Sequence, residues 1–390
     1  MRNELWTEVG FVSLNKQGES LCGDRVACSG GGGDKLTLVL SDGLGSGVKA
    51  NILATLTSTL LCRMLSGGVP LEECVAAVAR TLPVCKVRGV AYSTFTVLQV
   101  DGASARVIQL DNPATVLLRG GEVSEYSTVT REIAGKTVWE SSFSLREGDM
   151  LIAMSDGAEY AGVGQNLNFG WTRDELAQYA SANYQPSCTA KAMAGLLADE
   201  CDRLYGREPG DDTTLAVVRV RGRHAVNLWV GPPADKQQDE KLMHLFFASS
   251  GRKIVCGGTT GQLAARFLGK PIATTLDYPD PDVPPISQLE GVDLLTEGVV
   301  TLSKTLAYAQ DFLDSAKLAP AWAVQSDGAS LIARELFQEA TDVHFFVGQA
   351  INPAHQDPGL PIRFGVKLQI ITQLTECLEK MGKRVRVSYY

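Results

Sequence analysis

The stretch Leu36-Thr37-Leu38-Val39-Leu40-Ser41-Asp42-Gly43-Leu44-Gly45-Ser46-Gly47 decides how the first half of this chain is interpreted. Its apolar start is typical of a short strand, and the glycines that follow Asp42 permit backbone conformations that other residues resist. From Val48 the pattern changes, because Ile52, Leu56, Leu60 and Met64 recur at every fourth position. That spacing predicts a helix with one apolar stripe, ended by Gly67-Gly68-Val69-Pro70. A carboxylate therefore stands at a junction between a strand and a helix.

Three further sites place an aspartate beside a glycine or a second aspartate. They are Cys22-Gly23-Asp24-Arg25, Ser155-Asp156-Gly157 and Gly210-Asp211-Asp212-Thr213-Thr214. The apolar run Met150–Met154 leads into Asp156, and Leu215–Val218 follows the last pair. Carboxylates at strand ends, brought together by a fold, are what a hard divalent cation needs.

The rest of the first 220 residues mixes strands with a few helices. An alanine-rich helix is expected at about 71–82 and a helical region at about 172–205. The turns Val100-Asp101-Gly102 and Arg119-Gly120-Gly121-Glu122 contain residues typical of β-hairpin turns. An interval of charged turns follows the second of them. Because strands and helices do not alternate, this half is predicted as α+β rather than doubly wound. The expected strands are Tyr92–Val100, Ala105–Leu110, Thr115–Leu118, Asp149–Met154 and one that ends at Val220.

Length and composition limit the classes of function. With 390 residues, 45% of them hydrophobic, the chain is expected to form two domains. A net charge of −8 and the absence of a basic stripe argue against nucleic acid as a partner. No apolar leader or membrane-length segment is present, so the sequence predicts a cytoplasmic protein. Nine cysteines without a CxxC pair indicate neither a disulfide framework nor a thiolate zinc site.

In chain order, the four acidic motifs resemble the protein phosphatase 2C (PPM) superfamily, and in particular its bacterial SpoIIE-type serine/threonine phosphatases. Tyr92-Ser93-Thr94-Phe95-Thr96 resembles the small-residue strand after the helical pair of that branch. Asp111-Asn112-Pro113-Ala114 resembles its Gly-His-Pro-Pro turn, and Leu145–Leu151 is similar to the stretch before its third aspartate. The resemblance covers residues 1–222 and leaves 223–390 unexplained.

The resemblance implies a β-sandwich of two antiparallel sheets flanked by helices, with two Mg²⁺ or Mn²⁺ ions at one edge. By position, Asp42 would bridge the two metals, with the Gly43 carbonyl as a further ligand. Asp156 and Asp211 would hold the second metal. The implied reaction is hydrolysis of phosphoserine or phosphothreonine by a water or hydroxide that bridges the two ions. The implied partner is a phosphorylated protein, in this branch often an anti-sigma-factor antagonist, and a homodimer is one option for the assembly.

The other two acids have supporting roles in this assignment. Asp24 would bind through water or order the shell of the first metal, and Asp212 would support the cluster from behind. Asn112 stands where many members of the superfamily carry an aspartate for a third metal, so a third metal is not predicted. No counterpart is evident of the arginine that grips the substrate phosphate in eukaryotic members; Arg25 and Arg2 are expected at the surface.

The residue types favour the same chemistry independently of the family. Phosphate monoesters hydrolyse very slowly unaided, and two adjacent divalent ions supply both a nucleophile and charge neutralisation. All-oxygen ligation suits Mg²⁺ or Mn²⁺ better than zinc, because no His or Cys is part of the acidic motifs apart from Cys22. The four histidines all lie beyond residue 222, which argues against a histidine general acid.

Other interpretations stay open. Each aspartate taken alone is typical of a turn or a helix cap. The stretch Gly43–Gly47 follows a strand and precedes a helix, as a phosphate loop does, but lacks a third glycine and the P-loop lysine. A nucleotide-binding two-domain protein is therefore one alternative. A catalytically idle regulatory module that keeps the fold and binds a phosphoprotein is another, although the intact acid set favours the enzyme.

Residues 223–390 alternate strands with helices, which predicts a smaller α/β layered domain. Gly257-Gly258-Thr259-Thr260-Gly261 is expected as a tight loop that could hold an anion, or as a connection whose threonine caps the next helix. The loop 348–355 is a second candidate for the same cleft. A regulatory, dimerising or docking role follows only by analogy. Strands are expected at 229–230, 253–256, 343–347 and 384–389, and helices at 236–250, 262–268, 298–317, 327–340 and 363–380.

Overall fold

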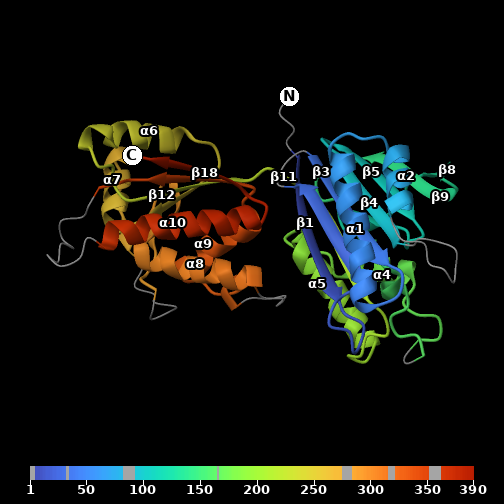
Figure 1. The fold of residues 1–390 in the computed structure, drawn as a ribbon. Coiled ribbons are helices and arrows are strands. Elements are labelled where there is room, and N and C mark those ends of the chain that lie inside the picture. The colour runs from blue at the N-terminus through green and yellow to red at the C-terminus, as the bar shows by residue number, and fades with distance from the viewer. Residues whose placement is uncertain are drawn as a thin grey trace. The chain divides into compact units, whose positions relative to one another are not determined.

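The computed structural model describes residues 5–31, 35–81, 93–164, 167–274, 283–314, 321–350 and 362–390. The chain forms two compact units, Met1–Gly222 (unit 1) and Arg223–Tyr390 (unit 2), shown in Figure 1. Among the described residues, no helix has the length and apolarity that a membrane span requires.

Unit 1 is built on two antiparallel sheets, as predicted. The five-stranded sheet has the order β1 (Leu5–Leu14), β11 (Thr213–Gly222), β10 (Met150–Met154), β6 (Val116–Arg119) and β7 (Glu122–Ser124). The six-stranded sheet has the order β2 (Asp24–Gly30), β3 (Lys35–Gly43), β4 (Ser93–Asp101), β5 (Ser104–Leu110), β9 (Lys136–Ser144) and β8 (Thr128–Ile133). The two sheets pack face to face, because Leu38 and Leu98 of one share a buried core with Leu151 and Val218 of the other.

Helices cover the outer face of each sheet (Figure 1). α1 (Gly47–Ser66) and α2 (Leu71–Thr81) pack on the six-stranded sheet through a core that contains Leu61, Val75 and Val97. α4 (Arg173–Ala182) and α5 (Ala190–Leu204) pack on the five-stranded sheet. Because β3 carries side chains into cores on both of its faces, its sequence reads as a continuous buried run.

The N-terminal part of the apolar stripe of α1 does not face the sheet, whereas Leu60 and Met64 farther along pack partly against the core. Val48, Ile52 and Leu56 are 57%, 52% and 39% exposed, whereas the small residues Ala50 and Ala54 are buried against the strands. The reason is the short distance between backbones at this point: a Cβ on Gly43 would lie 2.0 Å from the Ala50 carbonyl oxygen. Only small side chains fit between a helix and a strand that approach so closely.

Two other predictions for unit 1 need correction. The interval of charged turns after β6 contains β7, β8 and β9, of which β7 and β8 are edge strands whose exposed positions give little apolar signal. The single helical region at 172–205 is two helices, each with a threonine N-cap, Thr172 and Thr189, separated by a turn with Pro186. The expected ends at Leu82 and Tyr92 lie outside the described residues. The two hairpins are confirmed, with Gly120 and Gly121 both at positive φ.

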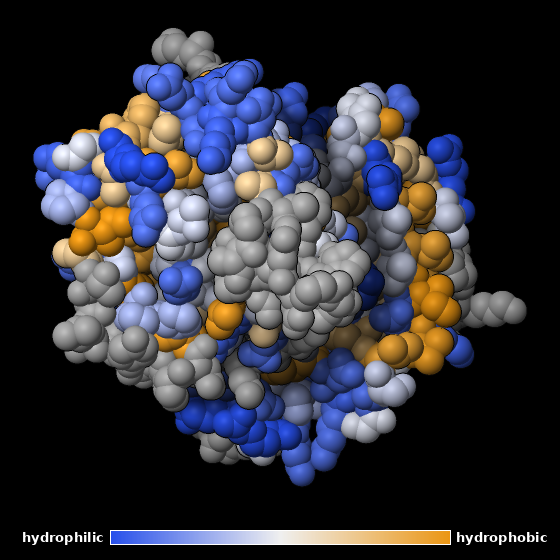
Figure 2. All heavy atoms as spheres, turned by 90° about the vertical axis from the view of Figure 1, so that its left-hand side faces the viewer, coloured by the Kyte–Doolittle hydropathy of each residue, from blue (hydrophilic) through white to orange (hydrophobic). Residues whose placement is uncertain are grey.

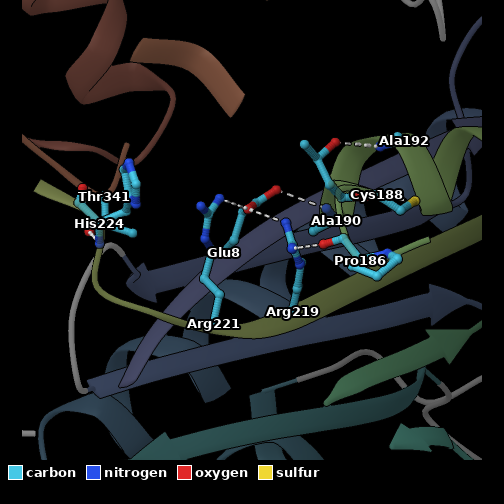
Figure 3. A network of polar contacts seen from close by, with 10 residues as sticks. Glu8, Pro186, Cys188, Ala190, Ala192, Arg219, Arg221, His224 and Thr341 are labelled. Carbon is cyan, nitrogen blue, oxygen red and sulfur yellow. Dashed lines mark hydrogen bonds and ion pairs between the residues drawn. The ribbon is translucent and has the colours of Figure 1, made fainter. Parts of the chain in front are cut away.

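A network of polar contacts fixes α5 to the outer face of its sheet (Figure 3). Glu8 Oε1 accepts a hydrogen bond of 2.8 Å from the Ala190 backbone N–H at the start of α5. Glu8 Oε2 lies 3.7 Å from Arg219 Nη1 and 3.5 Å from Arg221 Nη1. Arg219 also donates to the Pro186 carbonyl. The carboxylate thus connects β1, β11 and the loop before α5.

Unit 2 has a mostly parallel sheet of the doubly wound kind, which confirms an α/β region after unit 1. Its strand order is β14 (Ala273–Thr274), β15 (Ser287–Leu289), β16 (Val292–Thr296), β13 (Arg252–Cys256), β12 (Ala225–Val230), β17 (Asp342–Val347) and β18 (Arg384–Tyr389). The strands from β16 to β18 are parallel, whereas β14 and β15 are antiparallel additions at one edge.

Helices cover both faces of this sheet. α6 (Asp239–Ala248) and α7 (Gly258–Leu268) pack on one face. α8 (Val299–Asp314), α9 (Gly328–Ala333) and α10 (Ile362–Lys380) pack on the other, together with the π-helical turn Arg334–Glu339 and the 3₁₀ turn Ala321–Ala323. A further 3₁₀ turn, Lys236–Gln238, precedes α6. On the surface in Figure 2, hydrophilic and hydrophobic residues are interspersed.

The glycine-rich stretch after β13 is not a loop. α7 begins at Gly258, so Gly258–Gly261 form its first turn, and Gly257 at φ +112° is the N-cap without a side-chain cap. Thr260 does not cap the helix, because its Oγ1 accepts a 3.0 Å hydrogen bond from Gly231 N. Of the second candidate loop, 351–355 lie outside the described residues; Gly348 N donates to Val230 O at 2.9 Å, which joins the loops after β12 and β17.

Candidate metal centre

The acidic motifs lie at one end of the unit 1 sandwich, and both sheets contribute to them. Asp24 and Asp42 are direct partners across the β2–β3 ladder of the six-stranded sheet. Asp156 opens the short helix α3 (Asp156–Glu159) directly after β10. Asp211 and Asp212 directly precede β11, the strand that pairs with β10. The fold therefore brings strand ends together that are far apart in the sequence.

Asp24 is the most buried acid of the set, with 3% of its surface exposed. Its Oδ2 accepts a 2.7 Å hydrogen bond from the Ser155 hydroxyl, whereas its Oδ1 is buried without a hydrogen-bond partner. Burial raises the pKa of Asp24 from the usual 3.8 to about 7, although the Ser155 hydrogen bond opposes this shift. Repulsion from Asp212 and Asp156 adds to the rise. A buried oxygen without a partner is an expensive feature unless it serves a ligand.

Asp42 is surrounded by other carboxylates. Burial is the main reason why its pKa rises to about 9, and repulsion from Asp24, Asp156 and Asp211 adds to the shift. Burial, followed by repulsion from Asp211, also raises the pKa of Asp156. The interaction between the two carboxyl groups raises the pKa of Asp42 and opposes the rise in the pKa of Asp156, which favours a proton on Asp42. The cluster favours protons in the absence of another source of positive charge.

Asp211 and Asp212 meet the loop that connects β1 and β2. Asp212 is buried, and its Oδ1 accepts a 3.0 Å hydrogen bond from the Lys16 backbone N–H. Its Oδ2 is buried without a hydrogen-bond partner, like Oδ1 of Asp24. Asp211 Oδ1 accepts from Asp212 N at 3.0 Å and lies 3.6 Å from the Lys16 ammonium.

Two glycines let the backbone come close to these acids. A Cβ on Gly23 would lie 2.7 Å from Asp212 Oδ2, and a Cβ on Gly157 would lie 2.1 Å from the Asp212 carbonyl oxygen. Any side chain at either position would push the neighbouring strand ends apart. Gly23 therefore permits the approach of the two sheets, and Gly157 permits the approach of the ends of β10 and β11.

The donor set fits a hard divalent cation. The acids offer carboxylate oxygens, two of which are buried without a hydrogen-bond partner. The Cys22 thiol lies close by, but burial and the charge of Asp24 raise its pKa to about 12, which keeps it protonated and a poor ligand. As the side chains stand, no three His, Cys, Asp or Glu residues within the described segments form a ready-made metal site.

Asn112, at the position where a third-metal aspartate would stand, belongs to a neutral network. Its side chain accepts from the Thr94 hydroxyl and donates to Thr96 Oγ1 at 3.2 Å. Thr94 is the partner of Asp42 across β3 and β4, and Ser93 Oγ donates to the Asp42 carbonyl oxygen at 2.8 Å. These hydroxyl and amide groups support the backbone of Asp42 and add no charge.

Two residues at this centre are missing from the sequence-based assignment. Lys16 lies in an unremarkable turn eight residues before Asp24, and no local pattern distinguishes it from other surface lysines. Ser155 is part of the Ser-Asp-Gly motif, so its position was visible, but its contact with Asp24 depends on the packing of the two sheets.

Comparisons with known proteins identify the same region. The family model described as "Stage II sporulation protein E (SpoIIE)" matches residues 32–221. Stage II sporulation protein E of Bacillus subtilis (strain 168) is 25% identical over 233 residues, which is 57% of this chain and 27% of that protein. The chain thus spans about a quarter of the length of this relative.

Solved structures with the same kind of fold are more distant. The SpoIIE phosphatase domain from Bacillus subtilis, in a crystal form without domain swapping, is 23% identical with a TM-score of 0.43, and covers 57% of this chain and 95% of that chain. The RsbU and RsbW domains of Rv1364c from Mycobacterium tuberculosis are 20% identical with a TM-score of 0.46, and cover 63% of this chain and 70% of that chain. Residues 32–221 therefore form a SpoIIE-like domain, as the family model and the Bacillus subtilis relative indicate.

Proposed function

We propose that unit 1 is a metal-dependent serine/threonine protein phosphatase. The observation that carries this proposal is the acid cluster itself, in which carboxylates from both sheets repel one another and leave two buried oxygens without partners. Such a cluster costs stability unless cations neutralise it. Membership of residues 32–221 in the SpoIIE family supports the same activity.

The acids have distinct roles in this proposal. Asp42 is the carboxylate with most neighbours of its own charge, which suits a ligand shared by two Mg²⁺ or Mn²⁺ ions, with the Gly43 carbonyl beside it. Asp156 and Asp211 hold the second ion. Two bound ions would supply a nucleophilic water at neutral pH and neutralise charge on the phosphoryl group. Asp24 and Asp212 are buried behind these ligands and orient the cluster.

The direct test is hydrolysis of p-nitrophenyl phosphate and of a phosphoserine peptide by the purified chain. We expect turnover with Mn²⁺ and none in EDTA, because the acids alone provide no positive charge for the phosphoryl oxygens. Equal rates in EDTA would contradict the proposal. Measurable nucleotide affinity without Mn²⁺ or Mg²⁺ binding would favour a nucleotide-binding protein, and metal binding without turnover would favour an idle phosphoprotein-binding module.

Lys16 is a candidate for recognition of the substrate phosphate. Its ammonium lies 3.6 Å from Asp211 Oδ1 at the solvent side of the cluster, where both side chains are about two-fifths exposed. If Asp211 turns towards a cation, this ammonium loses its carboxylate partner. The ammonium can then pair with an oxygen of the substrate phosphate. In eukaryotic members of the superfamily, an arginine has this role.

Replacing Lys16 by alanine is expected to raise KM for a phosphoserine peptide about tenfold, the effect of losing one charge-assisted phosphate contact. The kcat value should change less, because Lys16 does not hold the cations. Lys35→Ala is the matched control, since Lys35 also pairs with an exposed aspartate, Asp101, at 3.3 Å. Steady-state kinetics at saturating Mn²⁺ give both constants. An unchanged KM in the Lys16 variant would remove the residue from the phosphate site.

The physiological substrate is proposed as a phosphorylated protein, for which an anti-sigma-factor antagonist is the candidate that the family offers. A regulatory, dimerising or substrate-docking role is proposed for unit 2.

A further inference from the structure

Ser155 joins the two sheets at the acid cluster. It lies between β10 and α3 in the five-stranded half of the sandwich and is fully buried. Its hydroxyl donates to Asp24 Oδ2, on β2 of the other sheet, at 2.7 Å. The same oxygen accepts from Thr214 N on β11 at 2.8 Å, and Ser155 N donates to Thr214 O at 3.1 Å. Ser155 thus links the end of β10 to β11 in its own sheet and to β2 in the other sheet.

In this geometry the two oxygens of Asp24 differ: Oδ2 accepts a hydrogen bond, and Oδ1 does not. The hydrogen bond from Ser155 holds Oδ2, and the hydroxyl itself cannot turn away because Thr214 N donates to it. The hydrogen bond to Oδ2 restricts rotation of the carboxylate, and Oδ1 stays buried without a hydrogen-bond partner, where the charges of Asp212 and Asp156 act on the group. A carboxylate held by one oxygen presents the other in one orientation.

We propose that Ser155 is a positioning residue of the metal centre: by holding Oδ2 of Asp24, it aims Oδ1 at the bound cation or its water shell. This inference rests on the proposed function of unit 1. The alternative is that the hydrogen bond only strengthens the contact between the sheets. The two differ in what they predict for metal affinity, because a purely structural contact affects unfolding without changing the affinity of the folded protein.

The test is Mn²⁺ binding to the Ser155→Ala variant, followed by the electron paramagnetic resonance signal of free Mn²⁺. We expect the affinity to fall by roughly 10- to 100-fold, the usual effect of losing a group that orients a metal ligand. Much of the lost phosphatase activity should return at saturating Mn²⁺, since Ser155 does not touch the substrate. Ser330→Ala is the matched control: Ser330 in unit 2 is also buried and donates to a buried aspartate, Asp327 Oδ2, at 2.5 Å.

Two further variants test whether Ser155 affects Mn²⁺ affinity through its hydrogen bond to Asp24. Ser155→Thr keeps the hydroxyl and should retain most of the affinity. In an Asp24→Asn background, Ser155→Ala should cause little additional loss, because both changes affect one interaction. Three results would each overturn the proposal. They are an unchanged Mn²⁺ affinity in Ser155→Ala, equal losses of affinity in the Ala and Thr variants, and full additivity of Ser155→Ala with Asp24→Asn. If the wild-type protein binds no Mn²⁺, the proposed function itself fails, and this outcome is distinct from the others.

Discussion

Replacing Asp42 by alanine is expected to abolish Mn²⁺-dependent hydrolysis of p-nitrophenyl phosphate, with a loss on the order of 10³-fold or more. Asp42 is the acid most affected by its neighbours, and in the proposed mechanism no other residue can take its place between two ions. Asp42→Asn should be as inactive, because it keeps the shape of the side chain and removes only the charge. Asp101→Asn, an exposed change at the other end of the β3–β4 ladder, should keep full activity.

The same Asp42→Asn change is expected to stabilise the metal-free protein near neutral pH. Burial and repulsion raise the pKa of Asp42 in the folded protein to about 9, so its ionised form is disfavoured by the fold. An amide has no charge to bury and removes repulsion from Asp24 and Asp156. Urea unfolding in EDTA measures the effect. Activity in Asp42→Asn would contradict the metal-binding role of Asp42. A lower stability than wild type in EDTA would contradict the unfavourable burial of its charge.

The second large effect concerns pH and metal together. The pKa values of Asp24 and Asp42 in the folded protein, about 7 and about 9, lie above the usual 3.8. Between pH 3.8 and about pH 9, the folded state therefore binds more protons than the unfolded state. The free energy of unfolding must fall as the pH rises through this range. In EDTA, unit 1 should unfold at progressively lower temperature from pH 5 to pH 9.

Mg²⁺ should reverse this trend. A cation that binds the ionised carboxylates of the folded state stabilises it, and it competes with protons, so its effect grows with pH. Thermal unfolding at pH 5, 7 and 9, with EDTA or with Mg²⁺, tests the expectation. The increase caused by Mg²⁺ should be smallest at pH 5. An increase that is the same at all three pH values would indicate binding elsewhere, and Asp42→Asn should reduce the dependence on pH in EDTA.

The order of the acidic motifs predicts the resemblance to the SpoIIE family, and the lack of strand–helix alternation predicts the α+β fold. Each motif ties a carboxylate to a glycine, and the structure shows why: Gly23 and Gly157 give way to the backbone and side chain of Asp212. The local sequence reveals this requirement for a residue without a side chain, because each glycine directly adjoins its aspartate. The metal assignments of Asp24, Asp42, Asp156, Asp211 and Asp212 stay predictions.

What the sequence could not provide depends on contacts between distant segments. Periodicity located α1 but not its buried face, because the strand it meets comes so close that alanine fits and isoleucine does not. β8 lies at an edge of its sheet and has too few buried positions to show alternation. Lys16 and Ser155 contact acids 195 and 131 positions away, which no local pattern encodes.

These separations also determine when the centre can form. Lys16 meets Asp212 across 196 positions, and β11 lies between β1 and β10 in its sheet. A chain emerging from the ribosome therefore lacks the centre until residues beyond 214 are available, even though the β2–β3 ladder that pairs Asp24 with Asp42 needs no residue beyond 43. If metal binds these acids as proposed, it cannot template the early folding of unit 1. It would bind only when the sandwich has closed, and its binding would report the completion of the domain.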